Sequence, residues 1–113
     1  MSKLLFIQKP SCTTCRKARA FLESHKIPFE SRDLDKQRLS SSEIEDLIGD
    51  RDYIPFLNPR NELYRKLNMR EKPPSRRKAI ELIAENPNLI RRPVIRAGKR
   101  VLTGFDAAEY KEF

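Results

Sequence analysis

Hydrophobic and polar positions near the start of the chain predict a strand, a helix and a second strand. Residues 3–8 include four consecutive apolar side chains, which is typical of a strand buried on both faces. Apolar residues such as Phe21 and Leu22 then recur at helical spacing, so we expect a helix that ends at about His25. Residues 28–34 alternate weakly between apolar and polar side chains and predict a second strand, parallel to the first through a right-handed crossover.

The middle third of the sequence is divided by prolines and capping residues and is predicted to be helical. Ser40–Glu43 can cap a short helix that Gly49 ends. A second short helix is expected to begin near Pro59–Arg60, because proline is favoured at the first helical position. Pro73–Ser75 ends one element and caps the next, which is an amphipathic helix that Asn86–Pro87 ends.

The last part of the chain has the pattern of a hairpin followed by a helix. Residues 93–96 and 100–103 predict two strands joined by Ala97–Gly98 as the turn, and a last helix is expected from Asp106. The order is therefore βαβ, helices, ββα, which predicts an α/β fold with a mixed four-stranded sheet and a helical insertion. Because 113 residues suffice for one core but not for two, we expect a single domain spanning residues 1–113.

Composition and charge narrow the expected partners. No apolar run approaches the length of a membrane span and no signal-peptide pattern is present, so we expect a cytoplasmic monomer without a membrane partner. The net charge of +8 could attract nucleic acid, phosphate-like anions or an acidic protein. The basic residues are spread along the chain without an aromatic platform, so direct nucleic-acid binding is not expected and the basic surface is interpreted as solvated.

Candidate chemistry comes from Cys12 and Cys15, which fall at the turn between the first strand and the first helix. The free backbone N–H groups and the positive dipole end of a new helix favour the thiolate of Cys12. Cys15 lies one turn further along and can close a small, reversible disulfide with Cys12, which makes Cys12 a nucleophile and Cys15 a resolving thiol. Basic residues around the turn are expected to add positive charge: Lys9, Arg16, Lys17 and Arg19.

Other interpretations of the two cysteines are weaker. A zinc site needs four ligands, and the chain has no third cysteine and a single histidine, His25, so no metal is expected. A purely structural disulfide is disfavoured because so short a loop removes little entropy from the unfolded chain. Inert thiols stay open as an alternative. His25 is expected to face solvent and is assigned no role.

Three segments, taken with the order of elements, resemble the arsenate reductase (ArsC)/Spx family of thioredoxin-like proteins over essentially the whole chain. They are residues 10–19 around the cysteines, residues 60–67, and residues 86–95. The resemblance implies a thioredoxin-like fold in which Cys12 is the redox nucleophile. It also implies that Arg92 lies beside Cys12, that Arg60 approaches from the insertion, and that the bond between Arg92 and Pro93 is cis.

Arginine suits such a site because its planar guanidinium can hold an oxyanion by two hydrogen bonds or stabilise a thiolate without losing its charge. On this basis Arg60, Arg92, Thr13 and Thr14 are predicted to bind a substrate anion. For Arg60 the alternative of a solvated residue at the start of a helix carries equal weight. Arg92 is the stronger candidate because it stands directly before the proline, in the loop that the resemblance places against the cysteine turn.

The resemblance implies one of two functions. Glutathione-dependent arsenate reductases of the family carry a single cysteine in this turn and an arginine after the hairpin, where this chain has Cys15 and Thr103–Gly104; this argues against arsenate as the substrate. We expect a reductase-like protein that acts on a disulfide or a small oxyanion, with no bound cofactor and with glutathione or thioredoxin as electron donor.

The alternative is a redox-sensing regulator of the Spx type, which binds the C-terminal domain of the RNA polymerase α subunit. The segment Gly49–Asp52 looks shorter than the docking region of those regulators, so the reductase is the first interpretation.

Overall fold

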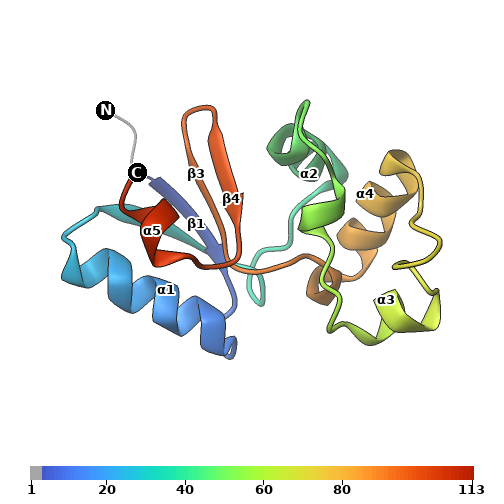
Figure 1. Ribbon diagram of the computed structural model, residues 1–113, viewed down its shortest axis with the longest axis horizontal. Coiled ribbons are helices and arrows are strands. Elements are labelled where there is room, and N and C mark those ends of the chain that lie inside the picture. The colour runs from blue at the N-terminus through green and yellow to red at the C-terminus, as the bar shows by residue number, and fades with distance from the viewer. Residues whose placement is uncertain (1–3) are drawn as a thin grey trace. The chain divides into compact units, whose positions relative to one another are not determined.

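The computed structural model describes residues 4–113, which form two compact units (Figure 1). The sheet unit comprises the chain up to Gln37 together with Arg92–Phe113, and the helical unit comprises Arg38–Arg91. Residue 3, with which the first strand was expected to begin, lies outside the described residues. The single domain over residues 1–113 stays a prediction.

The sheet unit contains the mixed four-stranded sheet that the sequence predicts. Its elements in chain order are β1 (Leu4–Gln8), α1 (Thr13–Ser24), β2 (Phe29–Asp33), β3 (Val94–Ala97), β4 (Arg100–Thr103) and α5 (Ala107–Tyr110). The strand order is β2-β1-β3-β4, with β1 parallel to β2 and antiparallel to β3. Strand β1 is therefore central, which explains why Phe6 and Ile7 are both fully buried.

The hairpin between β3 and β4 turns one residue later than predicted. Ala97 pairs with Arg100, so the turn consists of Gly98 and Lys99 and not of Ala97–Gly98. Gly98 has a φ of 62°, a left-handed conformation that glycine adopts without strain, and this fixes the turn position. Strand β3 also begins at Val94, because Pro93 has no N–H group to contribute to the ladder.

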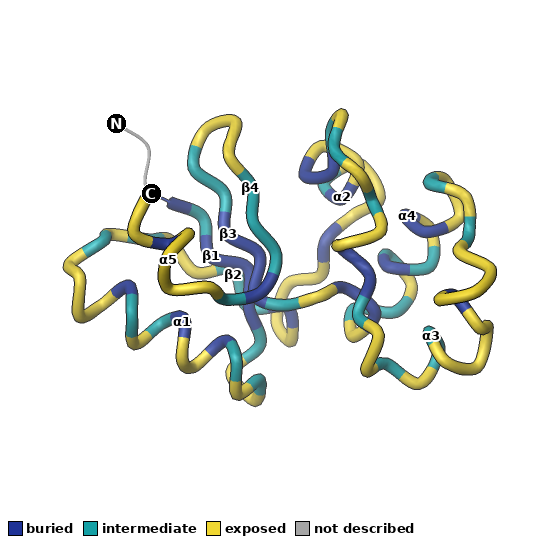
Figure 2. Tube along the Cα trace, in the orientation of Figure 1, coloured by how far each residue is buried: buried dark blue, intermediate teal, exposed yellow. Residues whose placement is uncertain are grey.

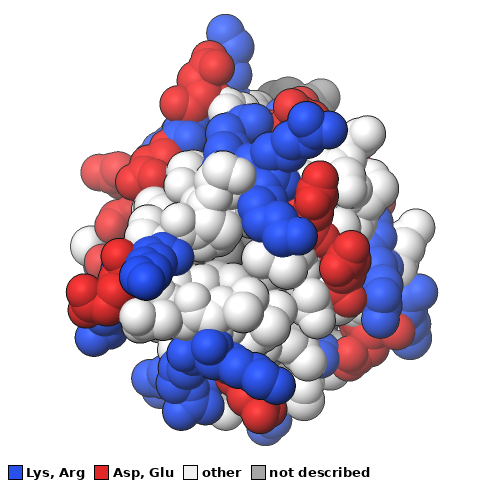
Figure 3. All heavy atoms as spheres, turned by 90° about the vertical axis from the view of Figure 1, so that its right-hand side faces the viewer, with Lys and Arg blue, Asp and Glu red and all other residues white. Residues whose placement is uncertain are grey.

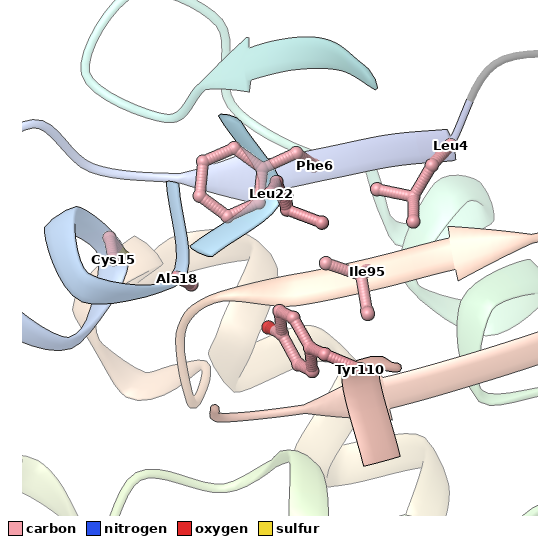
Figure 4. Close-up of a cluster of buried hydrophobic side chains, with 7 residues drawn as sticks. All are labelled: Leu4, Phe6, Cys15, Ala18, Leu22, Ile95 and Tyr110. Atoms are coloured by element: carbon pink, nitrogen blue, oxygen red, sulfur yellow. The ribbon is translucent and has the colours of Figure 1, made fainter. Parts of the chain in front are cut away.

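The core of the sheet unit lies between the sheet, α1 and α5 (Figure 4). Buried positions recur along one side of α1, as Figure 2 shows, and turn one face of the helix to the sheet. Fully or almost fully buried side chains make up this cluster: Leu4, Phe6, Cys15, Ala18, Leu22, Ile95 and Tyr110. One of the two cysteines is thus part of the hydrophobic core.

The helical unit consists of short elements with polar caps: α2 (Ser41–Ile48), the 3-10 turn η1 (Ile54–Phe56), α3 (Glu62–Lys66), α4 (Arg76–Glu85) and the 3-10 turn η2 (Pro87–Leu89). The expected caps of α2 and α4 are confirmed, with Ser40 and Ser75 as N-caps. The expected start of α3 near Pro59–Arg60 is wrong by about two residues. Asn61 is the N-cap, because its side-chain oxygen accepts the N–H of Leu63.

The surface carries both signs of charge, with lysine and arginine side chains in several separate groups on the face shown in Figure 3. Among residues 4–113, no helix has the length and apolar character that crossing a membrane requires.

Candidate active site

The turn between β1 and α1 places the two cysteines at defined positions of the helix. The N–H of Cys12 donates to the carbonyl of Lys9 at 3.0 Å, and the carbonyl of Cys12 accepts the N–H of Arg16 at 3.1 Å. Cys12 is the N-cap, with φ −80° and ψ 119°, and its Sγ accepts the N–H of Cys15 at 3.3 Å. The spacing of the two cysteines therefore puts Cys12 at the N-cap and Cys15 at the third helical position, whose N–H donates to the cap side chain.

The two thiols differ sharply in access to solvent. Cys12 is half-buried, whereas the Cys15 side chain is 1% exposed and packs in the core with Ala18 and Tyr110. Both cysteines are free thiols in this structure. A reagent or substrate in solution can therefore reach the sulfur of Cys12 and not that of Cys15.

The pKa of the Cys12 thiol is lowered from its ordinary value. Partial burial acts to raise this pKa, but several interactions that stabilise the thiolate outweigh it. In order of size they are the hydrogen bond from the Cys15 thiol, the hydrogen bond from the Cys15 N–H, and the charge and hydrogen bond of Arg92. Cys12 is the thiol that ionises first, as its position at the helix start predicts.

The pKa of the Cys15 thiol is raised to about 12, and burial is the largest cause. The hydrogen bond that Cys15 donates to Cys12 and the negative charge of the Cys12 thiolate also act to raise this pKa, while a backbone hydrogen bond from Lys9 and the charge of Arg92 act to lower it. As pH rises, the first proton lost from the pair is therefore that of Cys12, and the buried sulfur of Cys15 keeps its proton to higher pH.

The basic residues next to the cysteines in sequence make other contacts. The guanidinium of Arg16 donates to the carbonyls of Pro10 and Ser11, both at 3.2 Å, and so stabilises the turn. The ammonium of Lys9 lies 3.2 Å from the carboxylate of Asp35. Arg92, more distant in sequence, is the cation that lowers the pKa of Cys12, and only the family resemblance pointed to it.

Arg92 and Pro93 form the loop that leads into β3, within the same unit as the cysteines. The Arg92–Pro93 peptide bond is cis, the form that the resemblance implies, and Pro93 is buried. The Nε atom of Arg92 is buried as well. The structure thus brings together three of the candidate site residues, which are Cys12, Cys15 and Arg92.

The remaining candidate residues are placed as follows. Thr13 and Thr14 are the first two residues of α1; Thr13 is exposed and Thr14 half-buried. Arg60 belongs to the helical unit, where its side chain is exposed and its N–H donates to the Asn58 side chain at 3.1 Å. The anion-binding role of these residues stays a prediction.

Sequence reasoning missed Tyr110, which packs against Cys15 in the core, and Gly104, whose carbonyl accepts the Tyr110 hydroxyl at 2.8 Å. The packing of Tyr110 against Cys15 joins distant parts of the chain, and the hydrogen bond between Tyr110 and Gly104, six residues apart, belongs to no motif recognised in the sequence. His25 is exposed, as expected, and stacks on Phe21 with ring centroids 3.9 Å apart. In the described part of the chain, no three histidine, cysteine or acidic residues lie close enough to hold a metal ion.

Comparison with known proteins gives concordant results, since residues 7–113 match the ArsC family. The chain is 36% identical over 112 residues to the global transcriptional regulator Spx of Enterococcus faecalis, covering 97% of this chain and 85% of the relative. A solved ArsC family related protein from Bacteroides fragilis has 27% identity and a TM-score of 0.85, covering 98% of this chain and 97% of that one. A protein from Streptococcus mutans, described as a possible arsenate reductase, has 27% identity and a TM-score of 0.82 over 100% of both chains.

These similarities extend over both units and confirm the predicted thioredoxin-like fold with its helical insertion.

Proposed function

Since the chain belongs to the ArsC family, we propose that this thiol redox protein is a reductase in which Cys12 attacks the substrate and Cys15 resolves the intermediate. The observation that carries the proposal is the asymmetry of the two sulfurs. Cys12 is accessible, accepts two hydrogen bonds from Cys15 and has a lowered pKa, whereas Cys15 is buried and keeps its proton. A nucleophile and a resolving thiol require this difference.

In the first step the Cys12 thiolate attacks one sulfur of a substrate disulfide. A bond forms between Cys12 and that sulfur, the substrate's S–S bond breaks, and the other half leaves as a thiolate that takes up a proton from solvent. The charge and hydrogen bond of Arg92 help to stabilise the ionised form of Cys12 before the attack, so more of the reactive thiolate is present at a given pH than in an ordinary thiol.

In the second step Cys15 attacks Cys12. The negative charge on Cys12 and the hydrogen bond donated to it both raise the pKa of Cys15, and both disappear once Cys12 is in the mixed disulfide. Cys15 then loses its proton more easily, forms the Cys12–Cys15 disulfide and releases the remaining half of the substrate as a second thiol. Two electrons pass from the protein dithiol to the substrate, and glutathione or thioredoxin is the proposed donor that restores the dithiol.

A small oxyanion is the other substrate class that we propose for the same site. Arg92, Thr13 and Thr14, all in the sheet unit, would hold it by charge-assisted hydrogen bonds. A planar guanidinium suits this task because it presents paired donors at fixed spacing.

Turnover tests the reductase. Purified protein supplied with glutathione or thioredoxin and its reductase should reduce a model disulfide repeatedly, and Cys12→Ser should abolish the reaction. The matched variant Cys15→Ser should instead stop at the mixed disulfide on Cys12, which mass spectrometry detects. Failure of the wild-type protein to turn over with either donor would contradict the enzyme proposal.

A second candidate function is a redox-sensing transcriptional regulator, favoured by the 36% identity to the Spx regulator of Enterococcus faecalis. The proposed partner is the C-terminal domain of the RNA polymerase α subunit, and the Cys12–Cys15 disulfide would be the switch. Calorimetry with that domain and with the reduced and oxidised protein tests it. Micromolar or tighter binding in one redox state, without turnover, would favour the regulator over the reductase.

A further inference from the structure

Tyr110 in α5 is completely buried and is the last residue of the core cluster around Cys15 (Figure 4). Its ring packs edge-on against Phe105, with centroids 4.9 Å apart, and against Phe21, with centroids 5.9 Å apart. Hydrophobic packing explains the ring. It does not explain the hydroxyl, because placing a phenol oxygen in a core is unfavourable unless the group finds a hydrogen-bond partner.

The partner of that hydroxyl is the backbone of Gly104, which follows β4. The Tyr110 hydroxyl donates to the Gly104 carbonyl at 2.8 Å, in a fully buried position. Gly104 itself is buried and has a φ of 79°, a left-handed conformation that glycine adopts without strain. The tyrosine therefore fixes an irregular segment that would otherwise have a buried, unsatisfied carbonyl.

The N–H of the same glycine continues the chain of hydrogen bonds. It donates to the carbonyl of Pro93 at 2.7 Å. Pro93 directly follows Arg92, whose guanidinium lowers the pKa of Cys12 through its charge and a hydrogen bond. A continuous path thus runs from the Tyr110 hydroxyl to the residue that stabilises the Cys12 thiolate. It consists of one side-chain-to-backbone hydrogen bond, one backbone–backbone hydrogen bond and the peptide link between Arg92 and Pro93.

From this path we propose that Tyr110 is a positioning residue: its hydroxyl, acting through Gly104 and Pro93, holds Arg92 in the place where it stabilises the Cys12 thiolate. The attraction between the guanidinium and the thiolate falls with distance, and their hydrogen bond weakens steeply when its geometry is disturbed, so loosening the loop weakens both. The proposal concerns the same cysteine site as the proposed function. Its test is alkylation, which requires neither turnover nor a protein partner, so it can fail or succeed independently of the reductase and the regulator.

Tyr110→Phe removes the hydroxyl and keeps the ring and its packing. We expect the midpoint of the pH profile of Cys12 alkylation to move upward by about half a pH unit, which is a roughly threefold lower ratio of thiolate to thiol at a given pH. At high pH, where Cys12 is fully ionised, the alkylation rate should match that of the wild type. Circular dichroism and thermal unfolding establish that the variant is folded.

Tyr53→Phe is the matched control. The Tyr53 hydroxyl also donates to a backbone carbonyl, that of Pro74 at 2.6 Å, but in the helical unit. Its removal should leave the profile of Cys12 unchanged. An unshifted profile in Tyr110→Phe would overturn the proposal, as would equal shifts in the two tyrosine variants, because both results would reduce Tyr110 to a residue of general stability.

A double variant tests whether Tyr110 acts through Arg92. If it does, Tyr110→Phe should produce no additional shift once Arg92→Ala has removed the guanidinium. The opposite result, a full shift of the midpoint in the Arg92→Ala background, would show that Tyr110 acts on the cysteines directly from its place against Cys15 and would overturn the positioning role.

Discussion

Helix α1 of the sheet unit and helix α4 of the helical unit begin with the same hydrogen bond made by different atoms. In α4 the Ser75 hydroxyl oxygen accepts the N–H of Lys78 at 3.2 Å, and in α1 the Cys12 sulfur accepts the N–H of Cys15 at 3.3 Å. Both residues are N-caps with extended backbone conformations, three positions before the N–H that they accept. The backbone geometry of a helix start is therefore common to a structural position and to a reactive one.

The difference lies in what surrounds each cap and in the acid strength of its atom. A serine hydroxyl does not ionise at ordinary pH, whereas a thiol does, and the cap hydrogen bond helps to stabilise the resulting thiolate. Basic residues follow Ser75 directly, yet they do not make it reactive, because its hydroxyl stays protonated. At Cys12 the cation that lowers the pKa of the thiol is Arg92, the first residue of the second chain segment of the sheet unit. Reactivity thus requires an ionisable cap atom together with a cation held beside it.

Replacing the sulfur cap by an oxygen cap should have the largest effect. In Cys12→Ser the hydroxyl can accept the same N–H, so the free energy of unfolding should stay within about 1 kcal/mol of the wild type. Disulfide exchange should nevertheless fall by roughly a thousandfold or more, because the nucleophile is lost. Exchange kinetics and urea denaturation measure the two quantities. Substantial residual exchange would mean that Cys15 is itself accessible, against its burial.

The buried thiol should make the reduced protein less stable in alkali. Because the pKa of Cys15 is about 12 in the folded state and about 8.5 when unfolded, the unfolded state loses a proton first as pH rises. The free energy of unfolding should therefore fall by about 1.4 kcal/mol per pH unit above pH 8.5. The lowered pKa of Cys12 has the opposite effect on the free energy of unfolding, because here the folded state loses its proton first. This effect raises the free energy of unfolding as pH increases towards 8.5 and is constant above it.

The control for this pH dependence is Cys15→Ala, in which the decline should begin only near pH 10, where the raised pKa of the buried Tyr110 takes over. Identical slopes between pH 8.5 and 10 in the two proteins would show that Cys15 does not titrate as its burial requires.

Removing the cation should have an intermediate effect. In Arg92→Ala we expect the midpoint of Cys12 ionisation to rise by about one pH unit, which corresponds to about 1.4 kcal/mol. In Arg92→Lys the midpoint should lie between those of the wild type and Arg92→Ala, since lysine keeps the charge but lacks the planar guanidinium. The neighbouring Arg91 has an exposed side chain and belongs to the helical unit, so Arg91→Ala is the control and should leave the midpoint in place. Equal effects of the two alanine variants would reduce Arg92 to part of a diffuse basic surface.

Removing the oxygen cap should have the smallest effect on chemistry. Ser75→Ala leaves the Lys78 N–H without its side-chain acceptor and should lower the free energy of unfolding by about 1 kcal/mol. The alkylation profile of Cys12 should not change. A shift of that profile would mean that the two caps are energetically linked. It would contradict the view that the Ser75 cap is purely structural and independent of the reactive Cys12 cap.

Local sequence signals predicted most of the elements and the position of the cysteine pair. Hydrophobic spacing gave the strands and long helices, and Ser40 and Ser75 are ordinary caps. Errors occurred where two local preferences competed. Proline at a first helical position suggested that α3 starts near Pro59–Arg60, but Asn61 has the side chain that caps the helix.

The rest of the site could not be predicted locally, because it depends on contacts between residues that are far apart in the chain. Nothing around Arg92 distinguishes it from other arginines except the family resemblance, and the charge pattern pointed instead to Lys9 and Arg16, which make other contacts. Tyr110 likewise meets Cys15 only when α5 and α1 pack in the same core. Hydrophobic patterns encode which face is buried and carry no information on which polar groups meet there.

The most direct test of the account is the rate of alkylation of each cysteine against pH, resolved by mass spectrometry of the reduced wild-type protein. Cys12 should be modified with a midpoint below pH 8.5, the value of a free thiol, while Cys15 should stay unmodified until pH exceeds about 10. If Cys12 reacts with a midpoint at or above 8.5, or if the two cysteines react in parallel, the assignment of a thiolate nucleophile and a protonated resolving thiol is wrong.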